Sequence, residues 1–427
     1  MADPMHPDAG ARGTFDRARF DAFLARLRVD ALARETDRRL LFDEVAQLQS
    51  LGFGSLRVPR DLGGAGLSLE QVFEVLIDLA TADSNLAHLT RGHVAFVESL
   101  LLAGLRDGVE PTAREARWAA RLVRGDLVGN AQAERQELSE LSTRLERDSD
   151  GALRLTGAKY YTTGSIYADW IHLAALDGDE RVAVTVSAAL AGVRSIDDWD
   201  GFGQRLTGSG TTTFEAVLVD EDEVGRGRAD AAAWPYLGSV FQLVLLAVVA
   251  GIVQRALEDT VAFVRERRRT FGFAGEFRPR DDRLVQSVVG ALTSAAHGTR
   301  ALVLDSARTL DRTLEGIRSK TAAEGAARDA QLEVFRVQQL VLPLALDATS
   351  RLFEVGGASA VSTSLGLDRH WRNVRTVASH NPAAQRAAAL GEWELNGTLP
   401  DWGAPAAPTA PAAPTVAEDA AAQGVAR

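Results

Sequence analysis

The spacing of hydrophobic residues predicts that the chain begins with helices. Between residues 15 and 50, hydrophobic side chains recur every three or four positions among charged ones, which indicates two amphipathic helices. A glycine-rich segment over residues 51–66 interrupts this pattern. Further helices are expected from Ser68 to about Ala82 and from about Asn85 to Leu105.

The pattern changes at Leu127 and again after Val224. Between these residues, short runs of alternating hydrophobic and polar residues are separated by Asp- and Gly-containing turns, which predicts a β domain. Helical periodicity then returns in long segments, which predicts a helix bundle. The segments are Leu237–Arg269, Asp281 to about Leu314, and Gln331–Phe353.

These patterns predict an α+β protein with three folded parts and two disordered ends. The lead-in mixes charged residues with proline and glycine, and the tail, which is rich in Ala, Pro and Thr, cannot bury enough apolar surface to fold. The expected boundaries are a disordered lead-in over 1–14, a helical domain over 15–125, a β domain over 126–230, a helix-bundle domain over 231–400, and a disordered tail over 403–427.

Composition narrows the classes of function. Of the 427 residues, 47 are Lys or Arg and 58 are Asp or Glu, and the resulting net charge of -11 disfavours a nucleic-acid surface. The chain has no cysteine, which excludes disulfides, thiolate catalysis and Cys-ligated zinc and makes a reducing cytoplasm the simplest location. No metal site is expected. The apolar run Leu237–Val253 is shorter than the roughly twenty residues that a membrane span needs and is interpreted as a buried helix.

One basic stretch stands out in this acidic protein. Residues 368–382 contain several arginines, His370, His380 and an asparagine, and they end at Pro382, which stops a helix. The stretch is either a solvated helix end or a functional segment, because His380 lies at a proline-limited turn where loop residues often carry function. Gly356 and Gly357 just upstream would let backbone approach a ligand closely.

Other candidate segments have equally ordinary explanations. The hydroxyl-rich segments over residues 157–165 and 203–213 suit a ring system rich in acceptors, but threonine and glycine also dominate strand ends. The arginines that end the helix near residue 268 could clamp a phosphate or simply stabilise a helix C-terminus. His88 and His93 lie in a predicted helix, where a lone histidine is usually structural. Dinucleotide, Walker A, zinc-protease and serine-hydrolase motifs are absent.

In combination, these segments resemble the acyl-CoA dehydrogenase superfamily over about residues 15–400. The resemblance rests on residues 51–66, on 157–164, on Gly208-Ser-Gly-Thr, on Arg268-Arg-Thr-Phe-Gly272 and on Phe353-Glu-Val-Gly-Gly-Ala. It implies a helical N-terminal domain, a β-barrel-like middle domain and a C-terminal four-helix bundle. It also implies a flavoprotein that forms a homotetramer, in which the Gly-Gly turn meets the cofactor of a neighbouring subunit.

The chain departs from the dehydrogenases where their catalytic glutamate is often found. Ser379-His380-Asn381-Pro382 offers no carboxylate there. This ending, together with the runs 201–212 and 129–135, is similar to the reduced-flavin-dependent monooxygenases of the same fold, of the dibenzothiophene and alkylsulfone type. Such enzymes take reduced FMN from a separate NAD(P)H-dependent reductase, form a flavin C4a-hydroperoxide with O₂, and oxygenate a small, mostly apolar sulfur-, nitrogen- or ring-containing compound.

The resemblance assigns roles to particular residues. His380, His93 and Ser165 would be catalytic, with the two histidines flanking the flavin ring; Thr163 would join Ser165 near flavin N5, and Arg268 would bind the phosphate. The expected cofactor-binding residues are Asn130, Tyr161, Thr162, Thr163, Gly164, Ser165, Arg268, Phe271, Gly357, Ala358, Ser359 and His380.

Two alternatives remain open from the sequence. The first is an FAD-dependent acyl-CoA dehydrogenase whose catalytic glutamate has moved to the first bundle helix, at Glu258 or Glu266. The second is a non-catalytic flavin-fold protein that serves as an assembly partner. Neither nucleic acid nor membrane is expected as a partner.

Overall fold

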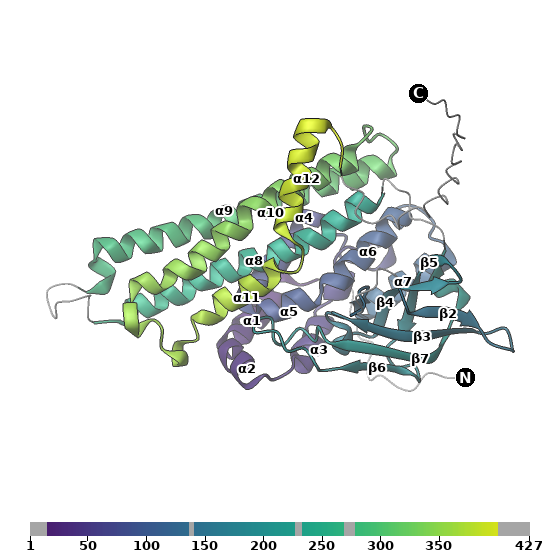
Figure 1. Cartoon of the computed structure of the whole chain (residues 1–427), viewed down its shortest axis with the longest axis horizontal. Coiled ribbons are helices and arrows are strands. Elements are labelled where there is room, and N and C mark those ends of the chain that lie inside the picture. Colours follow the sequence, from purple (N-terminus) through teal and green to yellow (C-terminus); the bar gives the residue numbers. More distant parts are fainter. Residues whose placement is uncertain (1–14, 136–140, 227–232, 269–277, 400–427) are drawn as a thin grey trace, which may run out of the picture.

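The computed structural model of the protein describes residues 15–135, 141–226, 233–268 and 278–399. Helices form its beginning and end, and a β-sheet lies between them in the sequence and at one end of the molecule in space (Figure 1). This is the predicted order of a helical part, a β part and a second helical part. The long C-terminal helices extend away from the sheet, so the chain has a sheet end and a distal end.

The first part of the chain contains more helices than the sequence predicts. The expected pair over residues 15–50 is three helices, because Asp30 and Arg38 interrupt it; Arg38 has a left-handed backbone with φ of 51°. The single helix expected over residues 85–105 is broken at Thr90. The helices are α1 (Arg17–Val29), α2 (Ala31–Asp37), α3 (Phe42–Ser50), α4 (Leu69–Ala82), α5 (Ser84–Leu89), α6 (Arg91–Ala103) and α7 (Ala113–Arg124).

Local signals in the sequence explain where α4 and α5 begin. Ser68 caps α4 by accepting a hydrogen bond from the backbone of Gln71, whose side chain in turn accepts one from the backbone of Ser68. Asp83 separates α4 from α5 and accepts hydrogen bonds from the backbone N–H groups of Asn85 and Leu86. The short helix α5 is therefore fixed by its cap.

The middle of the chain forms a mixed eight-stranded sheet. Its hydrogen-bonded order is β6-β7-β3-β2-β4-β5-β8, and β1 pairs in parallel with β4, with Asn130 opposite His172. The strands are β1 (Val128–Ala131), β2 (Arg144–Arg147), β3 (Leu153–Tyr160), β4 (Trp170–Asp177), β5 (Glu180–Ser187), β6 (Val193–Ile196), β7 (Thr211–Val219) and β8 (Val224–Gly225).

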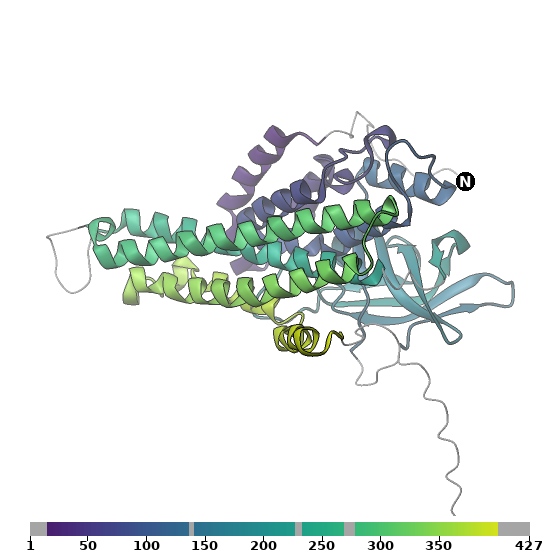
Figure 2. The ribbon, with the colours of Figure 1, turned by 90° about the horizontal axis from the view of Figure 1, so that it is seen from above.

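The last part of the chain is dominated by three long helices that run side by side (Figure 2). All three long helical segments predicted from the sequence are present, and the basic stretch 368–382 supplies a further helix and the turn after it. The helices are α8 (Ala233–Glu266), α9 (Arg283–Arg318), α10 (Ala326–Arg351), α11 (Asp368–Ala378) and α12 (Ala383–Asn396).

The N-terminal helices and the bundle share one hydrophobic core, whereas the sheet has its own. Helix α8 forms the centre of the shared core, and at Gly251 a Cβ atom would lie only 2.4 Å from that of Ala80 on α4. Helix α8 is long and apolar enough to cross a membrane, but 89% of its most apolar stretch is buried inside the protein. Its apolar character is therefore explained by packing.

Candidate active site

The three parts of the chain meet around α5 and the start of α6. Two glycines allow this approach: a Cβ atom at Gly164 would lie 2.2 Å from the carbonyl oxygen of Leu89, and one at Gly92 would lie 2.5 Å from the Cβ of Asn130. Gly164 also has φ of 82°, which favours glycine. The turn after β3 and the strand β1 therefore pack directly against the α5–α6 junction.

His380 reaches the same junction from the bundle. It follows the C-terminus of α11, and its Nε2 atom lies 3.2 Å from Nη1 of Arg91, the first residue of α6. The His380 side chain keeps an exposed surface, although protein atoms crowd it from several sides. Desolvation by the surrounding protein atoms, together with the positive charge of Arg91, lowers the pKa of His380 well below its usual value. The surroundings of His380, His88 and Arg91 are called the recess below.

The contacts of His380 define which of its nitrogens carries hydrogen. Arginine can only donate, so Nε2 accepts from Arg91 and Nδ1 donates to the Asn381 side-chain oxygen, 3.1 Å away. The side-chain amide nitrogen of Asn381 donates to the side-chain oxygen of Gln242 of α8 at 2.5 Å, and the backbone carbonyl oxygen of Asn381 accepts from the side chain of Gln338 of α10 at 3.1 Å. The imidazole is therefore neutral and is held by two bundle helices.

A second histidine, which was not among the predicted site residues, points to the same region. His88 of α5 is buried, and its Nδ1 donates to the side-chain oxygen of Gln204 at 3.0 Å, because the Gln204 amide nitrogen donates to Ser84. Its Nε2 is buried without a hydrogen-bond partner among the described residues. Burial lowers the pKa of His88 to about 4, so this nitrogen presents an unused lone pair.

His93, which the sequence comparison placed against the flavin ring, makes only structural contacts. Its Nε2 bonds the carbonyl oxygen of Gly54 at 3.1 Å, and its Nδ1 accepts from the backbone N–H of Val128 at 3.3 Å. The backbone occupies both ring nitrogens. These contacts leave no ring nitrogen of His93 for a flavin, whereas the Nε2 of His88 is free.

In the hydroxyl-rich turn that was predicted to face a ring system, some side chains are hydrogen-bonded within the protein and others are left to bind a ligand. Thr162 is scaffold, since its hydroxyl donates to the Gly210 carbonyl at 3.0 Å, and Thr163 bonds the Ser209 hydroxyl at 2.8 Å. Among the described residues, the hydroxyl of Ser165 has one hydrogen-bond partner, the backbone oxygen of Asn130 at 3.4 Å. The side-chain amide of Asn130 makes no hydrogen bond to any described residue, although Asn130 is buried.

Tyr161 lies at the edge of this region with half of its surface exposed. Its backbone is left-handed, with φ of 62°, and its ring makes edge contacts with Tyr160 and Trp199. Non-glycine residues in this conformation are uncommon and often mark functional turns. The aromatic ring is thus presented outward beside the hydroxyl-rich turn.

The remaining predicted cofactor residues lie at the distal end of the bundle. Gly356, next to the predicted Gly357, Ala358 and Ser359, packs against Phe263, and Arg267 beside Arg268 donates to the Val355 carbonyl at 3.0 Å. Arg91 contacts Phe241 of the same helix α8. From Phe241 to the end of α8 the helix rises by roughly 37 Å. Phe271 lies outside the described residues.

These distances separate the predicted residues into two groups. His380, Ser165, Thr163 and Asn130 gather around the α5–α6 junction, whereas Arg268, Gly357, Ala358 and Ser359 lie near the C-terminal end of α8. The gap exceeds the length of an FMN molecule. One subunit therefore cannot contact a single FMN with both groups.

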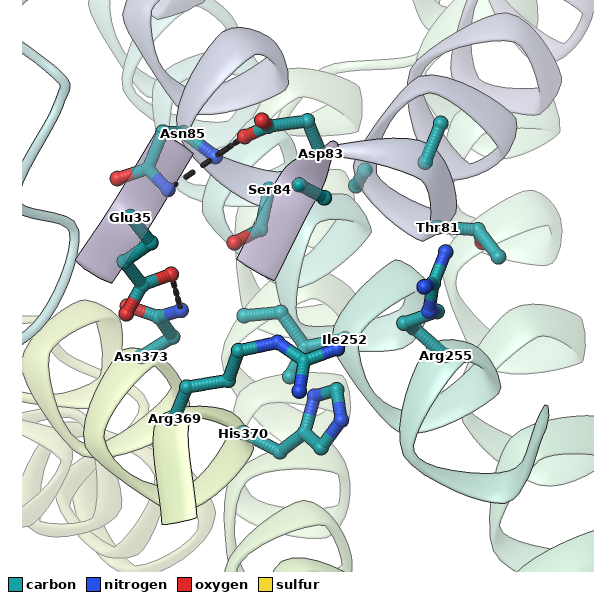
Figure 3. Close-up of a pocket in the computed structure, with 13 residues that line it drawn as sticks. Glu35, Thr81, Asp83, Ser84, Asn85, Ile252, Arg255, Arg369, His370 and Asn373 are labelled. Carbon is teal, nitrogen blue, oxygen red and sulfur yellow. Dashed lines mark hydrogen bonds between the residues drawn. The ribbon is translucent and has the colours of Figure 1, made fainter. Parts of the chain in front are cut away.

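A small polar cavity behind α5 contributes to positioning rather than to ligand binding. Its volume is about 30 Å³, room for one or two waters, and it lies between Asp83, Asn85, Arg369 and Asn373 (Figure 3). Asn373 accepts from the backbone N–H of Gln204 at 2.6 Å and donates to Glu35 at 3.0 Å. This network holds Gln204, which in turn holds His88.

Sequence reasoning missed His88, Arg91 and Gln204 as functional candidates. Gln204 lies inside the segment 203–213 that the sequence singled out, but its amide carried no recognisable signal. His88 was weighed equally with His93, and nothing local separates two histidines five positions apart. The distinguishing contacts come from residues remote in the sequence, such as Gln204 and Gly54.

Comparison with protein families agrees with this architecture. Residues 243–385 match the model of the acyl-CoA dehydrogenase C-terminal domain. The chain is 30% identical over 362 residues to a probable FMNH₂-dependent monooxygenase, SfnC, of Pseudomonas putida, covering 83% of this chain and 88% of that protein. It is 29% identical over 376 residues to a dibenzothiophene monooxygenase of Rhodococcus erythropolis, covering 84% and 87% of the two chains.

Solved structures agree with the same fold. FMN-bound TdsC from Paenibacillus sp. A11-2 superposes with a TM-score of 0.80 at 26% identity, over 90% of this chain and 98% of that chain. The methanesulfinate monooxygenase MsuC from Pseudomonas fluorescens gives a TM-score of 0.79 at 26% identity, over 90% and 97% of the two chains. The predicted fold class is confirmed.

Proposed function

The chain belongs to the reduced-flavin-dependent monooxygenases of the acyl-CoA dehydrogenase fold, and from this premise we propose that the recess around His380 oxygenates a small organic substrate with O₂ and reduced FMN. One oxygen atom enters the substrate and the other leaves as water, while reduced FMN supplies the two electrons and becomes FMN. The substrate is expected to be mostly apolar and to contain sulfur, nitrogen or an aromatic ring. Bound FMN supplies the O₂-activating chemistry.

The observation that carries the proposal is a set of unused polar groups at one junction. The Nε2 of His88 is buried without a hydrogen-bond partner among the described residues. The side-chain amide of Asn130, a residue with 8% exposure, also forms no hydrogen bond to a described residue. Buried polar groups in native proteins are almost always satisfied. A ring ligand with several nitrogen and oxygen atoms would satisfy them, and the hydroxyl of Ser165 lies beside them.

Each residue then has a definable task. Asn130 orients the flavin ring, and Thr163 and Ser165 hold its edge. His380 accepts or returns a proton at Nε2, and His88 accepts a hydrogen bond at its own Nε2, since both imidazoles are neutral at neutral pH. The tightly packed walls from three parts of the chain exclude water, which protects a reactive oxygen donor from decay.

The phosphate of the cofactor is proposed to be bound from a neighbouring subunit. Arg268 and Gly357–Ser359 are too far from His380 to reach the same FMN within one chain. A homotetramer in which the distal end of one bundle reaches the recess of a neighbour accounts for both groups. This arrangement supports the expected subunit-bridging role of the Gly-Gly turn.

The partners and location follow from the same scheme. Because the chain carries no dinucleotide-binding motif, reduced FMN would come from a separate NAD(P)H-dependent flavin reductase. A cysteine-free chain whose longest apolar helix is buried in its own core suits the cytoplasm.

The alternative with a displaced glutamate lacks support in the recess. Glu258 forms an ion pair with Arg28 at 3.2 Å and lies roughly 25 Å along α8 from Phe241, and Glu266 is exposed at the end of that helix. Among the described residues, no carboxylate forms a hydrogen bond or ion pair with His88, Arg91 or His380. Among the described residues, no carboxylate that could abstract a proton from a thioester is therefore bonded to these three side chains.

Oxygen uptake with chemically reduced FMN, measured over a panel of thioethers, sulfones and aromatic heterocycles, tests the proposal. We expect substrate-dependent uptake that yields an oxygenated product and water. Reduction of the bound flavin by an acyl-CoA, without any need for supplied reduced FMN, would overturn it in favour of a dehydrogenase. Purified protein that binds neither FMN nor FAD would indicate a non-catalytic role.

A further inference from the structure

Arg91 differs from other arginines inside the protein in having no carboxylate partner among the described residues. Arg34 pairs with Asp83 at 2.9 Å, Arg57 pairs with Glu98 at 2.6 Å, and Arg369 pairs with Asp259. Arg91 is 8% exposed and forms no ion pair with any described carboxylate. A buried cation without a counter-charge is costly, and proteins usually pair it.

The partners of Arg91 are all neutral. Its Nε donates to the carbonyl oxygen of Phe241 at 3.0 Å, its Nη1 donates to Nε2 of His380, and its guanidinium lies 4.8 Å from the centre of the Phe241 ring. Its Nη2 donates to no described residue. Burial lowers the pKa of Arg91 to about 10, so the group still carries its charge at neutral pH.

The position of this charge indicates what it binds. Arg91 contacts His380 and precedes Gly92, which packs on Asn130, so it lies among the residues proposed to surround the reacting atoms. The ring of Phe241 provides an apolar surface next to the guanidinium. A cation with a free N–H edge beside an apolar face fits a compact oxyanion attached to a hydrocarbon group.

We propose that Arg91 forms an oxyanion-binding subsite, so that the preferred substrates are organic anions carrying a sulfinate or a similar head that can gain an oxygen atom, on a small apolar body. This inference rests on the proposed function and makes the substrate only partly apolar. An aryl sulfinate illustrates the balance of the reaction. Its sulfur gains one oxygen atom, and RSO₂⁻, O₂ and FMNH₂ give RSO₃⁻, FMN and H₂O.

The oxyanion could also be the phosphate of FMN, and binding measurements distinguish the two. Calorimetry on flavin-free protein would compare benzenesulfonate with methyl phenyl sulfone, its neutral counterpart in which a methyl group replaces the charged oxygen. We expect the sulfonate to bind at least about 10-fold more tightly, the effect of one charge-assisted hydrogen bond. FMN affinity would be measured in parallel.

Variants at Arg91 make the assignment specific. Arg91→Gln should abolish the preference for the sulfonate and leave FMN affinity unchanged, while Arg91→Lys should retain part of the preference because it keeps the charge. Arg336→Gln, which removes an exposed arginine on α10, is a control of equal charge change and should behave as wild type. Near-ultraviolet circular dichroism would check that each variant folds.

Two results would overturn the inference. The first is equal affinity of the wild-type protein for the sulfonate and the sulfone. The second is an Arg91→Gln variant that loses FMN affinity but not sulfonate affinity, which would assign Arg91 to the flavin phosphate. Both are independent of the proposed reaction, whose failure would appear separately as missing oxygen uptake with reduced FMN.

Discussion

Nη1 of Arg91 lies 3.2 Å from Nε2 of His380, although 289 positions separate the two residues in the sequence. The contact joins the first residue of α6 to the turn after α11, and so joins the N-terminal helices to the bundle at the recess. Because arginine only donates, the contact also keeps His380 in the neutral form that carries its hydrogen on Nδ1. Nε2 can accept a proton during a reaction only when this hydrogen bond from Arg91 opens.

The first prediction concerns His380. His380→Ala should fold and bind FMN, but it should lose substrate oxygenation by roughly 10²- to 10⁴-fold, the usual contribution of a positioned acid-base group. Oxygen consumed by the variant should appear as hydrogen peroxide. Stopped-flow absorbance of the oxidising flavin and a peroxide assay measure both effects. His297→Ala on α9 is the control, since His297 is exposed; full coupling of oxygen to product in His380→Ala would contradict the assignment.

A second prediction separates the two buried histidines of α5 and α6. His88→Phe should lose oxygenation while retaining most of its stability, since only Gln204 loses a partner. His93→Phe should retain activity per folded molecule but lose about 1–3 kcal/mol of stability for each backbone group left unpaired at Gly54 and Val128. Turnover and urea unfolding of both variants are the measurements. The reverse pattern would return the catalytic role to His93.

A third prediction concerns Arg268. Arg268→Ala should weaken FMN binding by about 1.5–3 kcal/mol, the range for hydrogen bonds to a charged group, and Arg268→Lys should restore only part of it. Arg265→Ala tests whether any exposed arginine near the end of α8 has the same effect. Unchanged FMN affinity in Arg268→Ala would leave this residue as a cation near a helix C-terminus.

The separation of Arg268 from His380 predicts complementation between subunits. Arg268→Ala and His380→Ala chains, each impaired alone, should recover activity when they assemble together, because some recesses then receive both wild-type residues. Random mixing in equal amounts should restore about a quarter of the sites. The measurement is turnover of co-expressed, doubly tagged oligomers. Activity no greater than the sum of the separate variants would place both residues in the same subunit's site.

The buried histidines also predict the pH dependence of stability. Burial lowers the pKa of His93 from 6.5 to about 4, so the unfolded chain binds this proton first as the pH falls. The stabilisation is therefore present above pH 6.5 and is lost as the pH falls toward 4. For His93 alone, the free energy of unfolding should drop by about 2 kcal/mol between pH 7 and pH 5. Urea unfolding of wild type and His93→Phe should show a shallower pH slope in the variant; equal slopes would contradict the shifted pKa.

The sequence determined the elements of this protein and their order. Hydrophobic periodicity reports which face of each segment is buried, so the long helices α8, α9 and α10 and the central β part were predictable. The resemblance to the acyl-CoA dehydrogenase superfamily also predicted a role for His380, because a histidine and an amide stand where a carboxylate is often found, and this role stays a prediction. The predicted boundaries of the shorter helices were wrong, because the breaks at Thr90 and Arg38 depend on packing, which hydrophobic periodicity does not record.

Only the tertiary structure decided which side chains form one site. His88 and His93 are alike in local sequence but differ in their partners. Gly54 and Val128 bond both ring nitrogens of His93, whereas Gln204 bonds only Nδ1 of His88 and leaves its Nε2 free. Arg91 becomes a candidate for ligand binding only because it has no acidic partner among the described residues and contacts His380. Hydrogen bonds and uncompensated charge arise between residues distant in the chain, and local sequence does not encode that proximity.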